Sequence, residues 1–297
     1  MSAVIEPFPV RKTEHDWRKS DLIERLRYSR ETSHNIRHRG VVHELPSRES
    51  LQFILHKLST ALFPTHFGQA VFVDGSIDLY VASCLQEALP ALAIQVQRSL
   101  QFDLDEHASP DRSLRADTVI NTFAMQLPRI RDTLVMDFQA AYRGDPAAES
   151  IAEVVLGYRG TIAIIYHRFA HVLYAQGVRL VARLIADIAL ERTGIDIHPA
   201  AAIGEGFFID HGSGVVIGQT AIIGKNVRLY QGVTLGAKNF KADHDGNLLK
   251  GEPRHPIVQD NVVIYAGATI LGRVTIGEGA VIGGNAWITG NVSGANR

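Results

Sequence analysis

The stretch VVIYAGATILGRVTIGEGAVIGGNAWI, residues 262–288, decides the fold because small or aliphatic residues recur in it at every sixth position. A second aliphatic column lies two residues later in the sequence than the first. The two columns are Val262, Ala268, Val274, Ala280 and Ala286, and Ile264, Ile270, Ile276, Ile282 and Ile288. A helix has a period near 3.6 and a half-buried strand a period of 2, so neither produces this pattern. Hexapeptide repeats predict a parallel β-helix, in which short strands share one interior and turn a corner after each hexad.

The same period extends upstream, where we expect one six-residue register without a slip. Its first column is Ile197, Ile203, Ile209, Val215, Ala221, Val227 and Val233, and the second is Ile217, Ile223, Leu229 and Leu235. The step from Val233 to Val262 is not a multiple of six, so a polar excursion loop interrupts the repeat at 238–256. At three hexads per turn the stack has about four coils, with the left-handed sense usual for this repeat class. So short a stack leaves open ends, so we expect oligomerisation.

The first two thirds of the chain show helical patterning instead. We predict an α+β fold with a polar arm over residues 1–46, an all-α helical domain over 47–194, and a C-terminal left-handed parallel β-helix over 195–297. Asp145 before Pro146 is a signal for a helix start. Gly177 predicts a break between two helices, and Gly194 closes the helical part just before the hexads begin.

Composition excludes several classes of function. The net charge is −1, which gives no general attraction to nucleic acid or to a membrane surface. Cys84, the only cysteine, is expected to be a buried apolar residue. The N-terminus lacks an apolar signal core, and no stretch approaches the ~18 uninterrupted apolar residues of a membrane span. We therefore expect a cytoplasmic protein that binds neither nucleic acid nor membrane.

Polar residues inside a regular repeat indicate function. The inward column reads Ile or Leu in the later hexads, yet His stands at 211, preceded by Asp210. Asp196 lies 15 residues upstream, about one coil below. A carboxylate at that distance would fix the tautomer of the His211 ring and prepare it as a general base for a hydroxyl. The alternative, a corner histidine hydrogen-bonded to backbone, stays open.

The excursion loop ends in Arg254 and His255, between two prolines. Arginine suits the bidentate capture of a carboxylate, although a solvated loop end is the other interpretation. His244 and Asp245 within the loop are expected to face solvent. The histidines could supply zinc ligands, but no pair has the close spacing on one coil that would converge on an ion. We therefore expect no metal.

Together these residues resemble the serine O-acetyltransferase family. The motifs are GIDIHPAAAIG, IDHGSGVVIG, YQGVTLGA, RHP and GATILG, with MDFQAAYRGDPAAES and YHRFAHVLYAQG upstream, over about residues 132–290. Residues 1–130 resemble the family less closely. The resemblance implies transfer of acetyl from acetyl-CoA, as co-substrate, to the hydroxyl of L-serine, giving O-acetylserine for cysteine biosynthesis.

The resemblance also implies roles for individual residues. His211 is the general base and Asp196 its orienting partner. Asp145 and Asp210 bind the serine ammonium, and Arg254 with His255 clamps the carboxylate. The site lies between neighbouring prisms of a trimer, and acetyl-CoA lies against the small residues Gly236, Ala237, Ala266 and Gly284.

The implied assembly is a homotrimer or a dimer of trimers. The segment GNAWITGNVSGANR lacks the family's valine–proline-rich tail, so a complex with O-acetylserine sulfhydrylase is not expected. Two other functions remain open. One is a related hexapeptide acetyltransferase acting on another small hydroxyl or amine, such as a sugar or an antibiotic. The other is a trimeric scaffold without activity, which Asp196 and His211 argue against.

Overall fold

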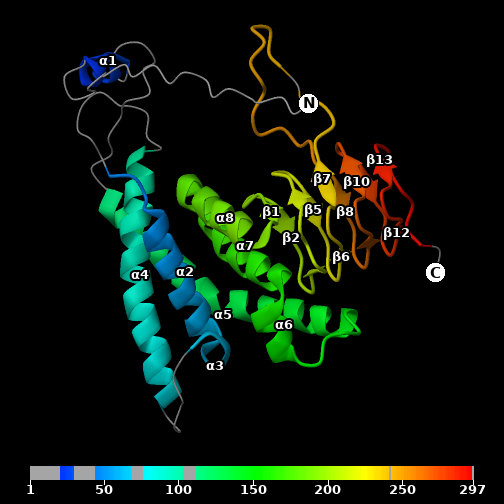
Figure 1. Cartoon of the computed structure of the whole chain (residues 1–297), viewed down its shortest axis with the longest axis horizontal. Coiled ribbons are helices and arrows are strands. Elements are labelled where there is room, and N and C mark those ends of the chain that lie inside the picture. Colours follow the sequence, from blue (N-terminus) through cyan, green and yellow to red (C-terminus); the bar gives the residue numbers. More distant parts are fainter. Residues whose placement is uncertain (1–20, 30–43, 69–75, 103–111, 241, 296–297) are drawn as a thin grey trace, which may run out of the picture. The chain divides into compact units, whose positions relative to one another are not determined.

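The computed structural model describes residues 21–29, 44–68, 76–102, 112–240 and 242–295, and it divides the chain into two units, 1–44 and 45–297. In the first unit the described residues form one short helix, α1 (Leu22–Tyr28). The greater part of the polar arm expected over 1–46 lies outside the described residues. The second unit holds the remaining helices and the β-helix (Figure 1).

Seven helices open the second unit. They are α2 (Arg48–Leu62), α3 (Pro64–Phe67), α4 (Ser76–Phe102), α5 (Arg112–Gly144), α6 (Ile151–Gly157), α7 (Arg159–Ala175) and α8 (Arg179–Thr193), within the described ranges. Gly177, with φ 85°, separates α7 from α8, and Gly194, with φ 71°, caps α8 in the left-handed region, as predicted. The expected helix start at Asp145 is wrong. Pro146 lies in a turn, and the side chain of Ser150 caps α6 instead by accepting from the Glu153 N–H.

Helix α4 is long as well as apolar. By length and composition alone its segment Ser76–Leu100, with mean hydropathy 1.3, could cross a membrane, although the sequence predicted no such stretch. The difference arises because Asp78, Glu87 and Arg98 interrupt the apolar run without lowering its mean below that level. α2 and α5 pack along α4, and Cys84 is buried there, 1% exposed, as expected. One face of α4 therefore packs into the bundle, and 17% of its apolar segment is buried.

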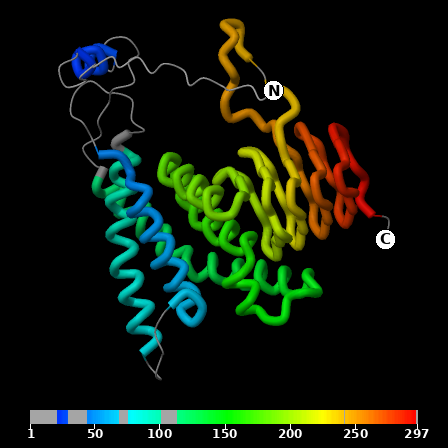
Figure 2. Tube along the Cα trace, viewed as in Figure 1, coloured from blue at the N-terminus to red at the C-terminus, as the bar shows by residue number. Residues whose placement is uncertain are grey.

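Parallel strands of two or three residues form the three walls of a left-handed β-helix (Figure 2). Sheet A contains β1, β4, β7, β10 and β13; sheet B contains β2, β5, β8 and β11; sheet C contains β3, β6, β9 and β12. The bounds are β1 (Asp196–Ile197), β2 (Ala202–Ile203), β3 (Phe208–Ile209), β4 (Val216–Ile217), β5 (Ile222–Ile223), β6 (Arg228–Leu229), β7 (Thr234–Gly236), β8 (Ile257–Val258), β9 (Val263–Ile264), β10 (Thr269–Leu271), β11 (Thr275–Ile276), β12 (Val281–Ile282) and β13 (Trp287–Ile288).

The register corrects one expectation. Later coils repeat every 18 residues apart from the one that contains the excursion loop, as in Val258↔Ile276, but the first coil repeats every 20, as in Ile197↔Ile217. Two extra residues therefore lie between β3 and β4, in the segment that contains His211. Ile197 belongs to the second aliphatic column, not to the column of Val215, so the register expected without a slip does slip there.

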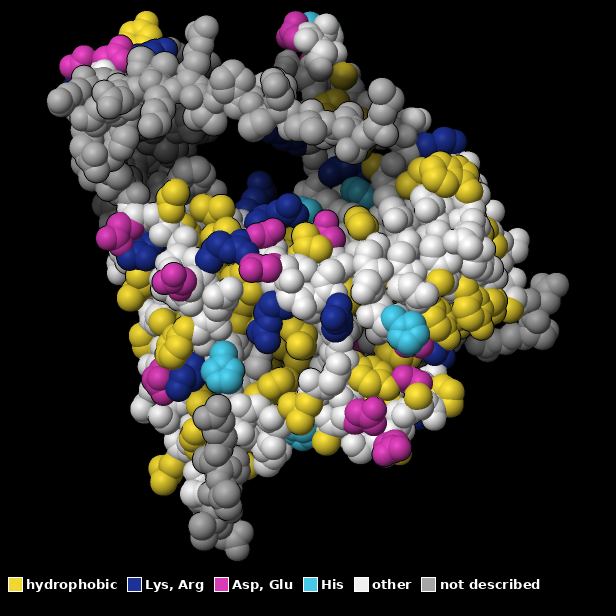
Figure 3. All heavy atoms as spheres, viewed as in Figure 1, with side chains coloured by type: hydrophobic (Ala, Val, Ile, Leu, Met, Phe, Trp, Pro, Cys, Tyr) yellow, Lys and Arg dark blue, Asp and Glu magenta, His cyan; other side chains and the backbone are white. Residues whose placement is uncertain are grey.

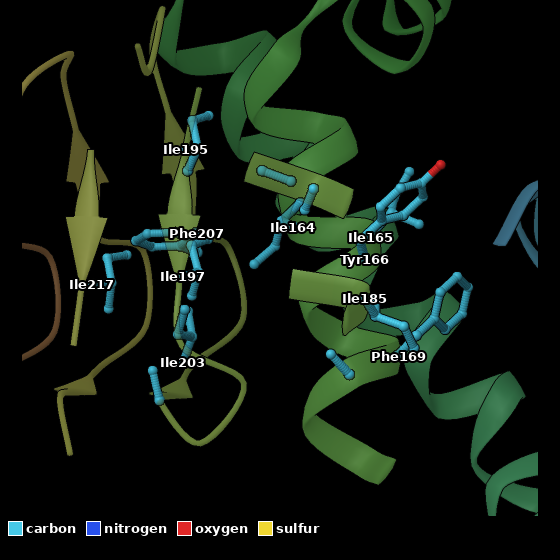
Figure 4. Close-up of a cluster of buried hydrophobic side chains, with 14 of the residues drawn as sticks. Ile164, Ile165, Tyr166, Phe169, Ile185, Ile195, Ile197, Ile203, Phe207 and Ile217 are labelled. Atoms are coloured by element: carbon cyan, nitrogen blue, oxygen red, sulfur yellow. The ribbon is translucent and has the colours of Figure 1, made fainter. Parts of the chain in front are cut away.

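The helices are joined to the first coil by apolar packing and by hydrogen bonds from one buried ion pair. Figure 4 shows Ile164 of α7 lying next to residues of the coil such as Ile197 and Phe207. Asp137 of α5, 2% exposed, accepts from the Phe207 N–H at 2.8 Å and pairs with Arg168 of α7 at 3.1 Å. Arg168 also donates to the carbonyls of Ile203 and Gly204. The first coil is therefore fixed against the two helices that flank the candidate site.

Candidate active site

The sequence-predicted residues gather along two edges of the prism. The first edge consists of the turns that lead from sheet C to sheet A, 210–215, 230–233, 265–268 and 283–286. The second edge consists of the turns that lead from sheet A to sheet B, 198–201, 218–221, 237–256 and 272–274. The first edge carries His211, Asp210, Ala266 and Gly284. The second edge carries Ala237, Arg254 and His255, with Gly236 at its start. Sheet A separates the two groups.

His211 occupies the lengthened turn of the first edge. Its φ is 57°, in the left-handed region, and its side chain is 70% exposed, so it does not lie in the inward column. Its Nδ1 lies 3.4 Å from Oδ1 of Asp210, whose side chain is 8% exposed. Oδ2 of Asp210 accepts from Arg228 Nη2 at 2.7 Å. A carboxylate beside Nδ1 favours the tautomer with its proton there, which leaves Nε2 as a base.

The guanidinium of Arg228 is enclosed by aromatic rings. It lies over Phe208, 5.0 Å from the ring centroid, and over Tyr230, 4.6 Å from the ring centroid. Tyr230 in turn stacks on Tyr265 of the next coil, with centroids 5.0 Å apart. These contacts hold the arginine flat against the first edge, where it neutralises the buried carboxylate of Asp210.

The helical part adds Asp145 to this group. Asp145 follows the last residue of α5 and accepts from the Ala147 N–H at 2.8 Å and from the Tyr158 hydroxyl at 2.5 Å. The Tyr158 hydrogen bond is the main reason that the pKa of Asp145 is lowered, and Arg228 and His211 lower it further. Burial raises the pKa of Tyr158, and so does the hydrogen bond to Asp145. A carboxylate that stays ionised beside an exposed imidazole is suited to bind an ammonium group.

Asp196 begins β1 and lies at the same edge, one coil below the turn of His211. Its N–H donates to the Val215 carbonyl at 2.9 Å, and its strand partner is Val216. Across the described ranges, the carboxylate paired with the His211 ring is Asp210, and no hydrogen bond or ion pair joins the ring to Asp196. The structure thus brings Asp145, Asp210 and His211 into contact or close range and places Asp196 beside them at the same edge.

Arg254 and His255 are held together by the turn Gly218–Thr220 on the second edge. Arg254 Nη2 donates to Gln219 Oε1 at 2.7 Å, and the Arg254 N–H donates to Thr220 Oγ1 at 2.9 Å. The His255 N–H donates to the same oxygen at 3.1 Å, and the Thr220 N–H donates to His255 Nδ1 at 3.1 Å. The end of the excursion loop is therefore an ordered part of the prism, not a solvated tail.

The imidazoles of the second edge are kept neutral. Burial lowers the pKa of His255 to about 4, with further contributions from Arg254 and Arg273. Burial likewise lowers the pKa of His198 to about 4. His198 contacts Tyr174 edge to face, and the Tyr174 hydroxyl accepts from Gln219 Nε2 at 3.3 Å. The second edge thus offers a guanidinium beside a neutral histidine.

The small residues expected along the cofactor path fall on both edges. Ala266 and Gly284 lie in successive turns of the first edge, where a Cβ on Gly284 would lie 3.3 Å from the Ala266 carbonyl oxygen. Gly236 ends β7, and a Cβ there would lie 2.8 Å from a methyl of Leu271. Ala237 follows it, half-buried. These positions leave the backbone of both edges accessible for hydrogen bonds to an extended ligand.

Sequence reasoning missed Tyr158, Arg228, Gln219 and Thr220. Gln219 and Thr220 could have been found only from the strand register. The pairing Ile222↔Ile257 brings the turns that precede these two strands side by side. His244 and Asp245 face solvent, with side chains 88% and 68% exposed, as expected. Within the described ranges no three His, Cys, Asp or Glu side chains are grouped to hold a metal ion.

The chain matches one protein-family model and several proteins of known name. The family described as "Bacterial transferase hexapeptide (six repeats)" matches residues 255–290. The protein named "Serine acetyltransferase, plasmid" from Synechococcus elongatus is 49% identical over 253 residues, 84% of this chain and 79% of its own length. An alignment of that length reaches well upstream of residue 132, so the helical region is shared with this relative. Serine acetyltransferase of Bacillus subtilis is 48% identical over 147 residues, and the chain spans 64% of that relative's length.

Solved structures give the same result. The structure of Entamoeba histolytica serine acetyltransferase 1 in complex with L-cysteine has a TM-score of 0.72 and 37% identity, over 86% of this chain and 88% of that one. The structure of soybean serine acetyltransferase complexed with serine has a TM-score of 0.53 and 31% identity, over 84% of this chain and 95% of that one. The likeness covers the helices as well as the prism.

Proposed function

The chain belongs to the serine acetyltransferase family and is an acetyltransferase of serine in cysteine biosynthesis, and we propose that it takes the acetyl group from acetyl-CoA at a site shared between two subunits. One observation carries the proposal. The candidate base and the ammonium-binding carboxylate lie on the first edge, and the candidate carboxylate clamp lies on the second. Both substrates are cytoplasmic metabolites, so the cytoplasm is the proposed location.

Sheet A separates the two edges, so one prism cannot close both around a single amino acid. A neighbouring prism resolves this if its second edge faces the first edge of this one. Repeating that contact around a threefold axis gives a homotrimer with three equivalent sites. Figure 3 shows hydrophobic side chains exposed over the β-helix, and sheet A itself exposes Val216 and Trp287, as an interface would require. We propose the trimer as the minimum assembly, with a dimer of trimers as the larger form.

The proposed acceptor is held by its charged groups. Asp145 binds the ammonium, because its carboxylate stays ionised and its hydrogen bonds come from neutral donors, whereas the charge of Asp210 is balanced by Arg228. Arg254 of the partner subunit binds the carboxylate through its guanidinium. A zwitterion fits between a carboxylate and a guanidinium, and a sugar does not supply these charges. L-Cysteine carries the same ammonium and carboxylate, so we propose that it occupies the same site.

The chemistry starts at the serine hydroxyl. His211 Nε2 accepts the hydroxyl proton as the serine oxygen attacks the thioester carbonyl carbon, while Asp210 stabilises the ring. We propose Asp196, at the same edge, as the orienting carboxylate when the turn closes on substrate. The tetrahedral intermediate then expels the thiolate of CoA, which takes the proton back from His211. Positioned general-base catalysis of this kind contributes roughly 10²–10⁴-fold.

The proposed path of acetyl-CoA follows the small residues of both edges. Gly236 and Ala237 of one subunit would face Ala266 and Gly284 of the next, so that a pantetheine arm lies in extended contact with backbone groups. The oxyanion needs a hydrogen-bond donor at the same place, and His255 is the proposed donor.

Two experiments test the proposal. Thiol release from acetyl-CoA should be strongest with L-serine among amino acids and sugars, and His211→Ala should lower it at least ~100-fold while the assembly persists. His211→Ala and Arg254→Ala are then co-expressed. A shared site predicts recovery of activity in mixed assemblies, because one interface then pairs an intact first edge with an intact second edge. Full activity of His211→Ala, or no recovery in the mixture, would contradict the proposal.

A further inference from the structure

The hydrogen bonds around His255 determine where its proton lies. The Thr220 N–H points at His255 Nδ1 from 3.1 Å, and a backbone amide can only donate. Nδ1 must therefore present its lone pair. The hydroxyl of Thr220 lies 2.9 Å from the same nitrogen.

The hydroxyl itself is fully used. Thr220 Oγ1 accepts from the N–H of Arg254 at 2.9 Å and from the N–H of His255 at 3.1 Å, which occupies both of its lone pairs. Its single hydrogen is left for His255 Nδ1. The N–H and the O–H of Thr220 thus both donate to His255 Nδ1, so the neutral ring carries its proton on Nε2.

The ring has little room to adopt another arrangement. A Cβ on Gly218 would lie 1.9 Å from His255 Cδ2 and 2.1 Å from Nε2, so the ring lies directly on this glycine. Arg273 Nη1 donates to the carbonyls of Thr220 and His255, at 2.6 and 3.0 Å, and ties the two strands together. Within the described residues Nε2 has no hydrogen-bond partner, and it is not among the buried side-chain atoms that lack one. Its N–H is therefore available at the surface of the second edge.

We propose that Thr220 is a positioning residue that fixes His255 as a neutral Nε2–H donor and holds Arg254 beside it. The inference rests on the proposed function and deepens it, because it gives His211 and His255 different roles. His211 offers an acceptor nitrogen and takes the proton. His255 offers an N–H and stabilises oxygen, so it cannot act as the base in this tautomer. Gln219 positions the guanidinium of Arg254 in the same way, by accepting a hydrogen bond from it.

The tautomer is tested in the resting protein, without substrate. With ¹⁵N-labelled histidine, the His255 ring is assigned by the signals that disappear in His255→Gln. The inference predicts a protonated Nε2 and an unprotonated Nδ1 at neutral pH, and a shift toward mixed tautomers in Thr220→Val. A protonated Nδ1 in the wild type, or a doubly protonated ring at neutral pH, would overturn it. This readout stands even if the protein failed to acetylate serine, which would count against the proposed function alone.

Kinetics give the second test. Thr220→Val should lower kcat roughly 10- to 100-fold, and Thr220→Ser, which keeps the oxygen, should restore most of it. With one donor to Nδ1 lost, the ring protonates more readily, so the pKa of His255, followed by its ¹⁵N ring signals, should rise in Thr220→Val. A merely structural loss would lower kcat without moving that pKa. Unchanged kinetics in Thr220→Val would reject the assignment.

Two further variants separate the parts of the proposal. Gln219→Leu should raise the KM for serine roughly tenfold and leave the KM for acetyl-CoA within about twofold. Thr122→Val, in an exposed threonine of α5 whose hydroxyl donates only within its own helix, is the control for the threonine-to-valine change and should match the wild type. If Thr220→Val fails to fold, the wild-type tautomer and Thr220→Ser still decide the question. An equal rise of both KM values in Gln219→Leu would refute its role at Arg254.

Discussion

Arg228 donates to the carboxylate of Asp210 from the coil above it, at 2.7 Å, and thereby occupies one of the two oxygens beside the candidate base. The other oxygen lies 3.4 Å from His211 Nδ1. Asp210 is thus shared between a permanent cation and the histidine that we propose as the proton acceptor. The strength with which it stabilises the charged ring depends on how much of its charge Arg228 already balances.

Replacing Arg228 should therefore change the pH dependence. In Arg228→Met the carboxylate of Asp210 has only His211 to balance it, so the acid limb of the kcat profile should move to higher pH. Arg228→Lys keeps the charge and should stay near the wild type. Profiles of kcat against pH decide the matter, and an unmoved limb in Arg228→Met would show that the two groups are not coupled.

Tyr158 should control serine binding through Asp145. In Tyr158→Phe the pKa of Asp145 rises toward its ordinary value, because its largest stabilising contact is lost. The KM for serine should increase roughly 3- to 10-fold, and the increase should grow as the pH falls. Tyr142→Phe, at an exposed tyrosine of α5, serves as the control. A KM for serine that is unchanged at every pH would disprove the link.

Asp137 should make a contribution to the free energy of unfolding that decreases as the pH rises. Burial raises its pKa from 3.8 to about 6, despite Arg168. A folded pKa above the unfolded one means that this contribution is fully present below pH 3.8 and is lost as the pH rises through 6. The free energy of unfolding of the wild type, minus that of Asp137→Asn, should fall by roughly 2–3 kcal/mol between pH 4 and 7.

Asp132→Asn, at an exposed aspartate on the same helix, is the control and should follow the wild type at each pH. Urea unfolding at a series of pH values gives the comparison. A difference that stays constant with pH would mean that Asp137 titrates alike in the folded and unfolded chain.

Two glycines test how closely α7 approaches the prism. A Cβ on Gly160 would lie 2.4 Å from the Ile209 carbonyl oxygen, so Gly160→Ala must push α7 away from β3 and should cost about 1–3 kcal/mol. Gly157, at the end of α6, has nothing within 4 Å of the same position. Gly157→Ala should be neutral or stabilising by up to about 1 kcal/mol. Equal melting temperatures for the two variants would exclude the close approach.

The walls of the prism could be predicted from the sequence, because each strand buries the same positions and the period is unmistakable. The lengthened turn could not. The two aliphatic columns are two residues apart, so an insertion of two residues moves one column onto the other and leaves no gap in the pattern. His211 was therefore predicted to replace an inward aliphatic residue, whereas it lies exposed in a left-handed turn.

The candidate site was predictable in its residue types but not in its contacts. Asp145 and Arg254 were found from their motifs, and the structure adds the groups that hold them, Tyr158 and Gln219. These pairs lie 13 and 35 residues apart, and only the packed coils and helices bring them together. A single chain's sequence also does not reveal that the candidates divide between two edges, because that division depends on which strand joins which sheet.

The turns of the prism vary in length far more than its strands do. Between β3 and β4 the chain has gained a pair of residues, and between β7 and β8 a whole loop, yet the strands on either side keep their neighbours in every sheet. New amino acids can thus be added where the ribbon bends without disturbing how it stacks. Descendants of such a protein can re-aim a reactive group, or acquire a different acceptor, and still inherit the same stacked fold.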